Sequence, residues 1–157
     1  MLLWEIVARF LFDERYFPLV LVQSPEEVER DGLEQLFRDF ERLFRLELRY
    51  ALVLDLTNIG HIPSAATRKQ IATWEAAHIA DTKRWNIGVA IALKSALVRG
   101  ALTALSWVVQ DESPRVHVAT RAQAIEHGIK LLEGEGIAIT PAIVELRREI
   151  ARDRLAS

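Results

Sequence analysis

Two nearly continuous apolar runs constrain the fold of this chain more than any other feature of its sequence. They lie at 51–56 and 87–93 and consist mostly of Val, Leu, Ile and Ala. Runs of this length and composition are typical of strands that are buried on both faces, which is the environment of a parallel sheet. Parallel neighbours need long crossover connections, and a stretch with helical periodicity separates the two runs. The sequence therefore predicts an α/β fold.

The rest of the chain supplies further strands and helices around these two runs. Residues 5–12 and 16–23 are rich in β-formers and flank the polar turn Asp13–Arg15, which predicts an N-terminal hairpin. Helical spacing and capping residues predict helices over 24–44, 64–84, 94–108, 121–132 and 140–155, with a short strand at 115–119. The expected fold is a single mixed, mainly parallel sheet of about five strands, with four helices packed on it and an extra C-terminal helix.

Length and composition fit one domain without covalent crosslinks. Half of the 157 residues are apolar, which is enough for a sizeable core. We expect residues 1–136 to form the domain and residues 137–157 to form a helical extension that packs on this domain or on a second subunit. Cysteine is absent, which excludes disulfides and thiolate zinc sites. The start has no basic leader and no apolar window is long enough for a membrane span, so we expect a cytoplasmic location without membrane insertion.

Several functional classes lack the residues that they require. The formal net charge is −2, without the basic excess that is typical of nucleic-acid binding. The four histidines show no metal-ligating spacing, and no glycine-rich phosphate-binding motif is present. Asp55 and Ser64 are the least implausible base and nucleophile, but no nucleophile elbow accompanies them. We therefore expect a protein that is not an enzyme and that uses no cofactor and no metal.

Two segments and the order of the elements carry a resemblance to a known family. Asp55-Leu-Thr-Asn-Ile-Gly-His-Ile-Pro-Ser64 follows the central strand, and Ser95-Ala-Leu-Val-Arg-Gly-Ala-Leu-Thr-Ala-Leu105 follows the next one. The chain thereby resembles the STAS superfamily, and especially its bacterial SpoIIAA-like branch, over roughly residues 5–133. The best-known members are antagonists of anti-sigma factors. The resemblance implies a STAS-like regulatory domain that acts through protein–protein interaction.

The same segment bears on phosphorylation. The family's antagonists carry Asp-Ser-Ser-Gly in this loop, and a partner kinase phosphorylates the second serine. Without gaps, the counterparts here are Pro63, Ser64, Ala65 and Ala66, so that alanine occupies the phosphoacceptor position. Phosphorylation of the family type is therefore not expected, and Ser64 is the residue that would accept a phosphate if any did.

Two loops at the carboxyl ends of neighbouring strands collect the candidate binding residues. In open α/β sheets, ligands bind at this edge, where loop amides and helix N-termini meet. The candidates are Asp55, Thr57, Asn58, His61 and Ser64 in the first loop and Lys94, Ser95 and Arg99 in the second. The alternative is structural: the two serines cap helices, each contributing about 1 kcal/mol, and Asp55 binds loop amides.

Two functions from different classes remain as expectations. The leading one is a STAS-like module without catalytic activity, which docks on a bacterial cytoplasmic partner protein through the helix at 64–84 and the loop at 57–64. The alternative is a protein that binds a small anionic or lipid-like ligand with the loops at the carboxyl ends of the strands. A homodimer is a possible assembly, through a sheet edge or the last helix.

Overall fold

The computed structural model describes residues 9–100 and 114–156, in which five strands form one sheet. The strands lie in the sheet in the order in which they occur in the chain, with β1 antiparallel to β2 and every later neighbour parallel. They are β1 (Leu11–Asp13), β2 (Leu19–Gln23), β3 (Tyr50–Asp55), β4 (Asn86–Ala92) and β5 (Arg115–Val118). The predicted α/β class, with an N-terminal hairpin and a mainly parallel sheet, is confirmed.

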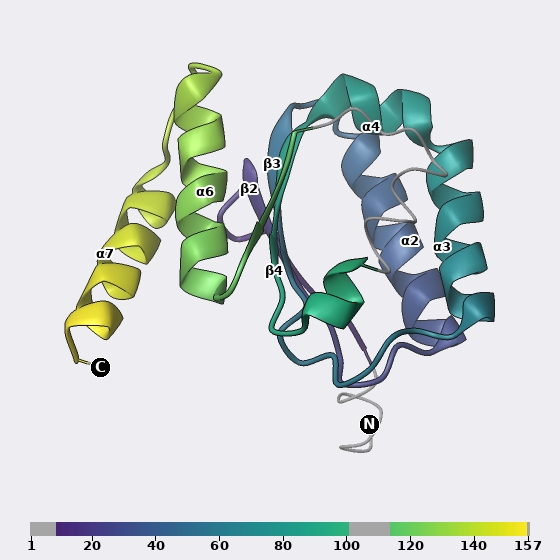
Figure 1. Cartoon of the computed structure of the whole chain (residues 1–157). Coiled ribbons are helices and arrows are strands. Elements are labelled where there is room, and N and C mark those ends of the chain that lie inside the picture. Colours follow the sequence, from purple (N-terminus) through teal and green to yellow (C-terminus); the bar gives the residue numbers. More distant parts are fainter. Residues whose placement is uncertain (1–8, 101–113, 157) are drawn as a thin grey trace, which may run out of the picture.

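Helices cover both faces of this sheet. One face carries α2 (Arg30–Phe44), α3 (Ala65–Ala77) and α4 (Ile79–Trp85), and the other carries α6 (Arg121–Gly134). Helix α7 (Pro141–Ala156) packs on the outer side of α6, so that Figure 1 shows the layers α2/α3, sheet, α6 and α7 in succession. This arrangement follows from the parallel strands, because each crossover returns the chain over one face of the sheet.

The face under α6 is packed closely. The strand residues that β3 and β4 contribute to it are small or β-branched, such as Ala51, Val53 and Ala90, and all three are buried. Gly128 of α6 sits directly on them: a Cβ there would lie 2.7 Å from Leu19 Cδ1 and 2.9 Å from Val53 Cγ2. Glycine is therefore required for the close approach of this helix to the sheet. A capping box between Thr120 and Gln123 fixes the start of α6.

The opposite face carries larger side chains. Tyr50, Leu52, Val89 and Ile91 point from β3 and β4 toward α2, where they meet Phe, Leu and Trp side chains of the helices. This face is the one that contains the cavity described below.

Helix α7 is held on α6 of its own chain. Ile143, Leu146 and Ile150 are buried in the same apolar cluster as the inner residues of α6. Arg147 also forms ion pairs with Glu126 at 2.8 Å and Glu133 at 2.9 Å. The Arg147 guanidinium lowers the pKa of the Glu126 carboxyl, so this pair contributes stability when the carboxyl is ionised.

Two boundaries near the N-terminus differ from the prediction. The turn was expected at Asp13–Arg15, but Asp13 ends β1 and the turn extends to Pro18, which has no N–H to donate to the sheet. The next helix was expected to begin at Ser24–Pro25, but α2 begins at Arg30. The Ser24 amide donates to the Asp55 carbonyl at 2.9 Å, so the chain still follows the sheet at that point.

The predicted helix over 64–84 is two helices. The chain departs from helical geometry at His78, where φ is −114° and ψ is 15°, and α4 starts one residue later. The helix predicted over 94–108 is observed over 96–100, and its expected continuation to 108 lies outside the described residues. The predicted strand residues 5–8 lie outside them as well.

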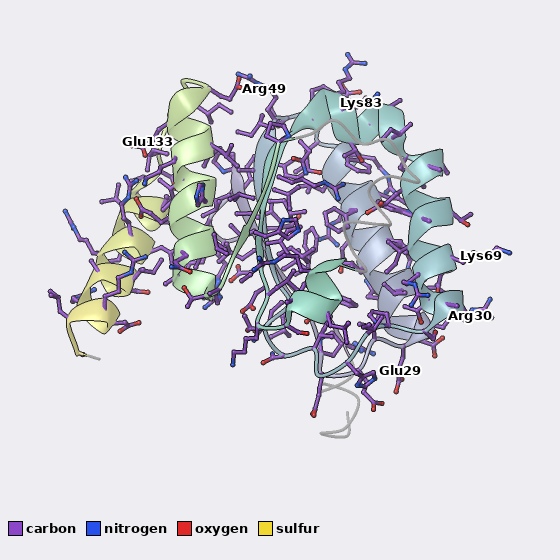
Figure 2. All side chains as sticks on the ribbon, in the orientation of Figure 1. Glu29, Arg30, Arg49, Lys69, Lys83 and Glu133 are labelled. Atoms are coloured by element: carbon purple, nitrogen blue, oxygen red, sulfur yellow. The ribbon has the colours of Figure 1, made fainter. Side chains whose placement is uncertain are left out.

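Charged side chains lie on the outer surface of the layers. Arg49, Lys69, Lys83 and Glu133 all point away from the sheet in Figure 2. None of the helices in the described part of the chain is both long enough and apolar enough to cross a membrane.

Candidate functional site

Asp55 holds the first predicted loop together. Its side chain is 5% exposed, and its Oδ1 atom accepts hydrogen bonds from the Thr57 amide at 3.0 Å and the Thr57 hydroxyl at 2.6 Å. Its Oδ2 atom lies 3.9 Å from Arg121 Nε on α6. The carboxylate therefore binds the turn that follows β3. This is the structural alternative that was predicted for Asp55 from the sequence.

The other residues of this loop also have local partners. Asn58 Nδ2 donates to the Ser24 carbonyl at 3.4 Å, and Thr57 and Asn58 border one shallow depression. The Ser64 hydroxyl accepts from the Thr67 amide at 3.1 Å and caps α3. His61 and Ser64 border a second depression, whose rim includes three glutamates, Glu26, Glu27 and Glu29. An acidic rim of this kind disfavours the anion that the sequence suggested for this edge.

The second predicted loop is a helix start. The Ser95 hydroxyl accepts from the Val98 amide at 3.4 Å, and the Lys94 and Arg99 side chains are exposed. None of these three residues borders the two depressions of the first loop. The structure therefore does not bring the two groups of candidates together around one pocket.

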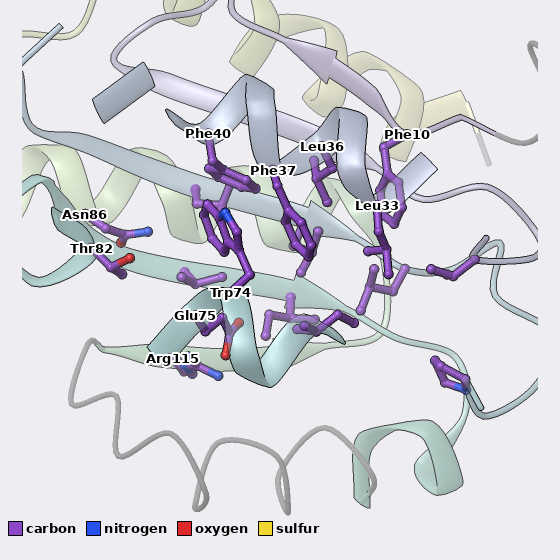
Figure 3. A pocket seen from close by; sticks show the side chains of 18 of the residues that line it. Phe10, Leu33, Leu36, Phe37, Phe40, Trp74, Glu75, Thr82, Asn86 and Arg115 are labelled. Carbon is purple, nitrogen blue, oxygen red and sulfur yellow. The ribbon is translucent and has the colours of Figure 1, made fainter. Parts of the chain in front are cut away.

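A cavity lies elsewhere, between the sheet and the helices α2, α3 and α4. Its volume is about 180 Å³, and Figure 3 shows side chains from α2, α3 and the strands pointing into it. Most of its lining is apolar. The lining residues include Phe10, Val28, Leu33, Leu36, Phe37, Phe40, Phe44, Leu52, Leu54, Ile71, Trp74, Ile79, Val89 and Ile91.

Stacked rings form the wall of this cavity between α2 and α3. The Phe37 and Trp74 rings are parallel, with centroids 4.7 Å apart, and His78 stacks on the other side of Trp74 at 4.3 Å. Glu41 of α2 accepts a hydrogen bond from Trp74 Nε1 at 3.1 Å and lies 3.3 Å from His78 Nε2. These contacts join α2 to α3 and fix the orientation of the indole ring.

A few polar side chains interrupt the apolar lining. They are Glu75, Thr82, Asn86, Arg115 and His117. Asn86 is buried and accepts a hydrogen bond from the Gly88 amide at 2.7 Å, so it serves the backbone of β4. Burial, followed by the charges of Arg99 and Arg115, lowers the pKa of His117 below its ordinary value, and the imidazole is neutral at pH 7.

This cavity is not among the sites predicted from the sequence, although the sequence carries one signal of it. Arg115 and His117 are two residues apart on a strand, so both point to the same face of the sheet. Their neighbours across the ladder are Val89 and Ile91, which face the helix layer. Polar residues that alternate into an apolar face indicate a function or a special partner.

The composition of the lining is that of a binding site. The cavity offers a partly open apolar volume with few hydrogen-bonding groups, which is the usual composition of a small-molecule site. No cluster of three or more metal-ligating side chains occurs within residues 9–100 and 114–156. Comparison of the chain with protein-family models, with curated proteins and with solved structures gave no match, so the resemblance to the STAS superfamily stays a prediction.

Proposed function

We propose that this chain is a binding domain without catalytic activity that holds one small, mainly apolar ligand between its sheet and the helices α2, α3 and α4. The observation that carries this proposal is the aromatic-lined cavity of about 180 Å³. The proposed function is the ligand binding that was the alternative expectation from the sequence. The proposed site, however, lies inside one helix–sheet interface and not in the loops at the strand ends.

The size of the cavity limits the ligand. A dry apolar cavity of about 150 Å³ takes up benzene, whereas drug-sized ligands need about 300 Å³ or more. The volume of about 180 Å³ therefore suits a single aromatic ring with a small substituent, and a long acyl chain is too large. The proposed ligand is therefore smaller than the lipid-like ligand that was the alternative from the sequence.

Energetics also favour an occupied site. The apolar side chains that line the unfilled space lack van der Waals partners on that side, which costs free energy. A ligand that restores the missing van der Waals contacts recovers part of this free energy. Binding should therefore raise the melting temperature of the protein.

Toluene is the probe that tests this proposal. We expect ligand-observed NMR and thermal denaturation to show saturable toluene binding by the wild-type chain and no binding of a long-chain fatty acid. Leu54→Trp should abolish toluene binding, because Leu54 lines the cavity and an indole would occupy it. Leu48→Trp is the matched control, since Leu48 is 54% exposed. Absence of toluene binding to the wild type, or its persistence in Leu54→Trp, contradicts the proposal.

A second proposal follows from the resemblance to STAS proteins, namely docking on a partner protein through α3 and the loop before it. It is supported by the exposure of this surface: α3 has no fully buried residue, and Asn58, His61 and Ser64 are exposed. Crosslinked capture from a native lysate tests it. Docking through α3 is supported if one partner is captured by the wild type and by the control Lys130→Glu on α6 but is lost in Lys69→Glu on α3. Equal capture by all three proteins contradicts it.

A further inference from the structure

Two uncharged polar side chains, Thr82 and Asn86, line the cavity where α4 passes into β4. Thr82 belongs to the last turn of α4, and the backbone N–H of Asn86 donates to the Thr82 carbonyl at the end of the helix. Residues four apart in such a turn are neighbours on its surface, and Figure 3 shows both side chains at the same end of the cavity. The mainly apolar volume therefore has one end that can form hydrogen bonds.

A hydrogen bond to the backbone fixes which part of the Asn86 amide remains for a ligand. Asn86 is 8% exposed, and its Oδ1 atom accepts from the Gly88 backbone N–H at 2.7 Å. An amide NH₂ group cannot accept this bond, so the oxygen faces the backbone of β4 and Nδ2 is the other end. Within residues 9–100 and 114–156, Nδ2 makes no hydrogen bond. Asn86 thus offers N–H donors to a molecule in the cavity.

The Thr82 hydroxyl supplies the complementary group. Thr82 is partly buried, and its hydroxyl makes no hydrogen bond to another residue of the described chain. A hydroxyl oxygen accepts hydrogen bonds as well as donating one. An oriented N–H donor and an acceptor at the same end of the cavity match a ligand hydroxyl, because its oxygen accepts from Asn86 and its hydrogen is donated to Thr82.

The absence of charge on these two side chains favours a neutral ligand group. Moving an ionised group out of water costs far more free energy than moving a hydroxyl, unless a charged partner receives it. Glu75 and Arg115 also line the cavity, but each already takes part in an interaction of its own. The hydrogen-bonding end formed by Thr82 and Asn86 therefore suits a neutral hydroxyl, and the remaining lining suits an apolar ring.

We propose that the ligand is a small phenol, with its ring among the aromatic side chains of the cavity and its hydroxyl between Asn86 and Thr82. The phenolic oxygen accepts from Asn86 Nδ2, and the phenolic O–H donates to Thr82 Oγ1. This inference rests on the proposed ligand-binding function and adds the chemical class of the ligand to it.

Phenol and toluene separate the inference from the function on which it rests. The two molecules have nearly the same shape, but phenol carries a hydroxyl where toluene has a methyl group. A hydroxyl that enters an apolar cavity without a hydrogen-bonding partner loses its bonds to water, so phenol binding depends on the polar end and toluene binding does not. We expect calorimetry or ligand-observed NMR of the full wild-type chain to show saturable binding of both probes.

Variants of Thr82 then identify the residue responsible. Thr82→Val keeps the shape of the side chain without its hydroxyl and should weaken phenol binding by roughly tenfold while leaving toluene binding unchanged, whereas Thr82→Ser should retain phenol binding. Thr73→Val is the matched control, because Thr73 is exposed on α3 and does not line the cavity, and it should change neither affinity.

The two probes also separate the possible failures. Toluene binding without phenol binding by the wild type, or a ratio of the two affinities that Thr82→Val leaves unchanged, overturns the inference and leaves the proposed function standing. Absence of binding for both probes overturns both.

Discussion

Replacement of Gly128 by alanine tests how closely α6 approaches the sheet. The new methyl group would lie 2.7 Å from Leu19 Cδ1 and 2.9 Å from Val53 Cγ2, and both distances are too short for carbon atoms. Leu19 can move the end of its side chain, but Val53 is β-branched and stiff on a central strand. Overpacking of a well-filled core costs about 1–3 kcal/mol, and the higher helix propensity of alanine returns at most about 1 kcal/mol. We expect a net destabilisation of up to about 2 kcal/mol.

Gly134→Ala is the matched control, because it makes the same change on the same helix. A Cβ at Gly134 has no neighbour within 4 Å, so only the propensity effect remains and the free energy of unfolding should rise by up to about 1 kcal/mol. Urea denaturation measures both values, and for a domain of this size each kcal/mol shifts the melting temperature by about 2–4 °C. If both variants stabilise the protein equally, the close packing under α6 is refuted.

Three further predictions concern single side chains. Ser64→Ala should lower the free energy of unfolding by about 1 kcal/mol in urea denaturation, because it removes the cap of α3, and an unchanged value would contradict that role. Arg147 lowers the pKa of Glu126 in the folded protein, so the Glu126–Arg147 pair stabilises the fold above the unfolded pKa near 4.5, and this stability is lost as the pH falls through the folded pKa. In Glu126→Gln, the free energy of unfolding should therefore fall less steeply with acidification between about pH 5 and 3. The folded pKa of His117 lies below its ordinary value of 6.5, so the unfolded chain binds more protons and stability falls as the pH drops below that value; His117→Gln should flatten this part of the pH profile.

The sheet could be predicted because its signal is local. Residues 51–56 and 87–93 are apolar enough to require burial on both faces, and the helical periodicity between them leaves few alternatives to a crossover. The N-caps at Ser64 and Thr140 could also be recognised, because each is a hydroxyl residue directly before a helical pattern. In the structure, each hydroxyl accepts a hydrogen bond from a backbone amide of the first helical turn.

The boundaries that failed depend on distant contacts. Ser24 followed by Pro25 has the pattern of a helix start, but the Ser24 amide is used by the Asp55 carbonyl on the neighbouring strand. The break at His78 accompanies the stacking of this ring on Trp74 and its contact with Glu41 of α2. Neither partner can be inferred from the residues adjacent in sequence, because tertiary contacts override local preference.

The candidate site was harder to predict than the fold. Thr57, Asn58 and Ser64 are the polar types that ligands use, but they are also the types that close turns and cap helices, and here they do the latter. The cavity depends on how Phe37, Trp74 and their neighbours fill the space between two layers. That is a property of packed shapes, and a pattern of apolar residues in a sequence does not specify it.

The order of the strands has a consequence for how the chain acquires its structure. Because β1 to β5 lie side by side in chain order, each parallel strand pairs with the strand made just before it, and no position has to be kept open for a later segment. Each parallel pairing, such as Leu19 with Ala51 or Val89 with Arg115, still spans a crossover connection, and non-local pairing of this kind is associated with slower folding than local contacts are. During synthesis, the sheet can grow at one edge as each strand leaves the ribosome, which limits the time for which an unpaired edge is available to another chain.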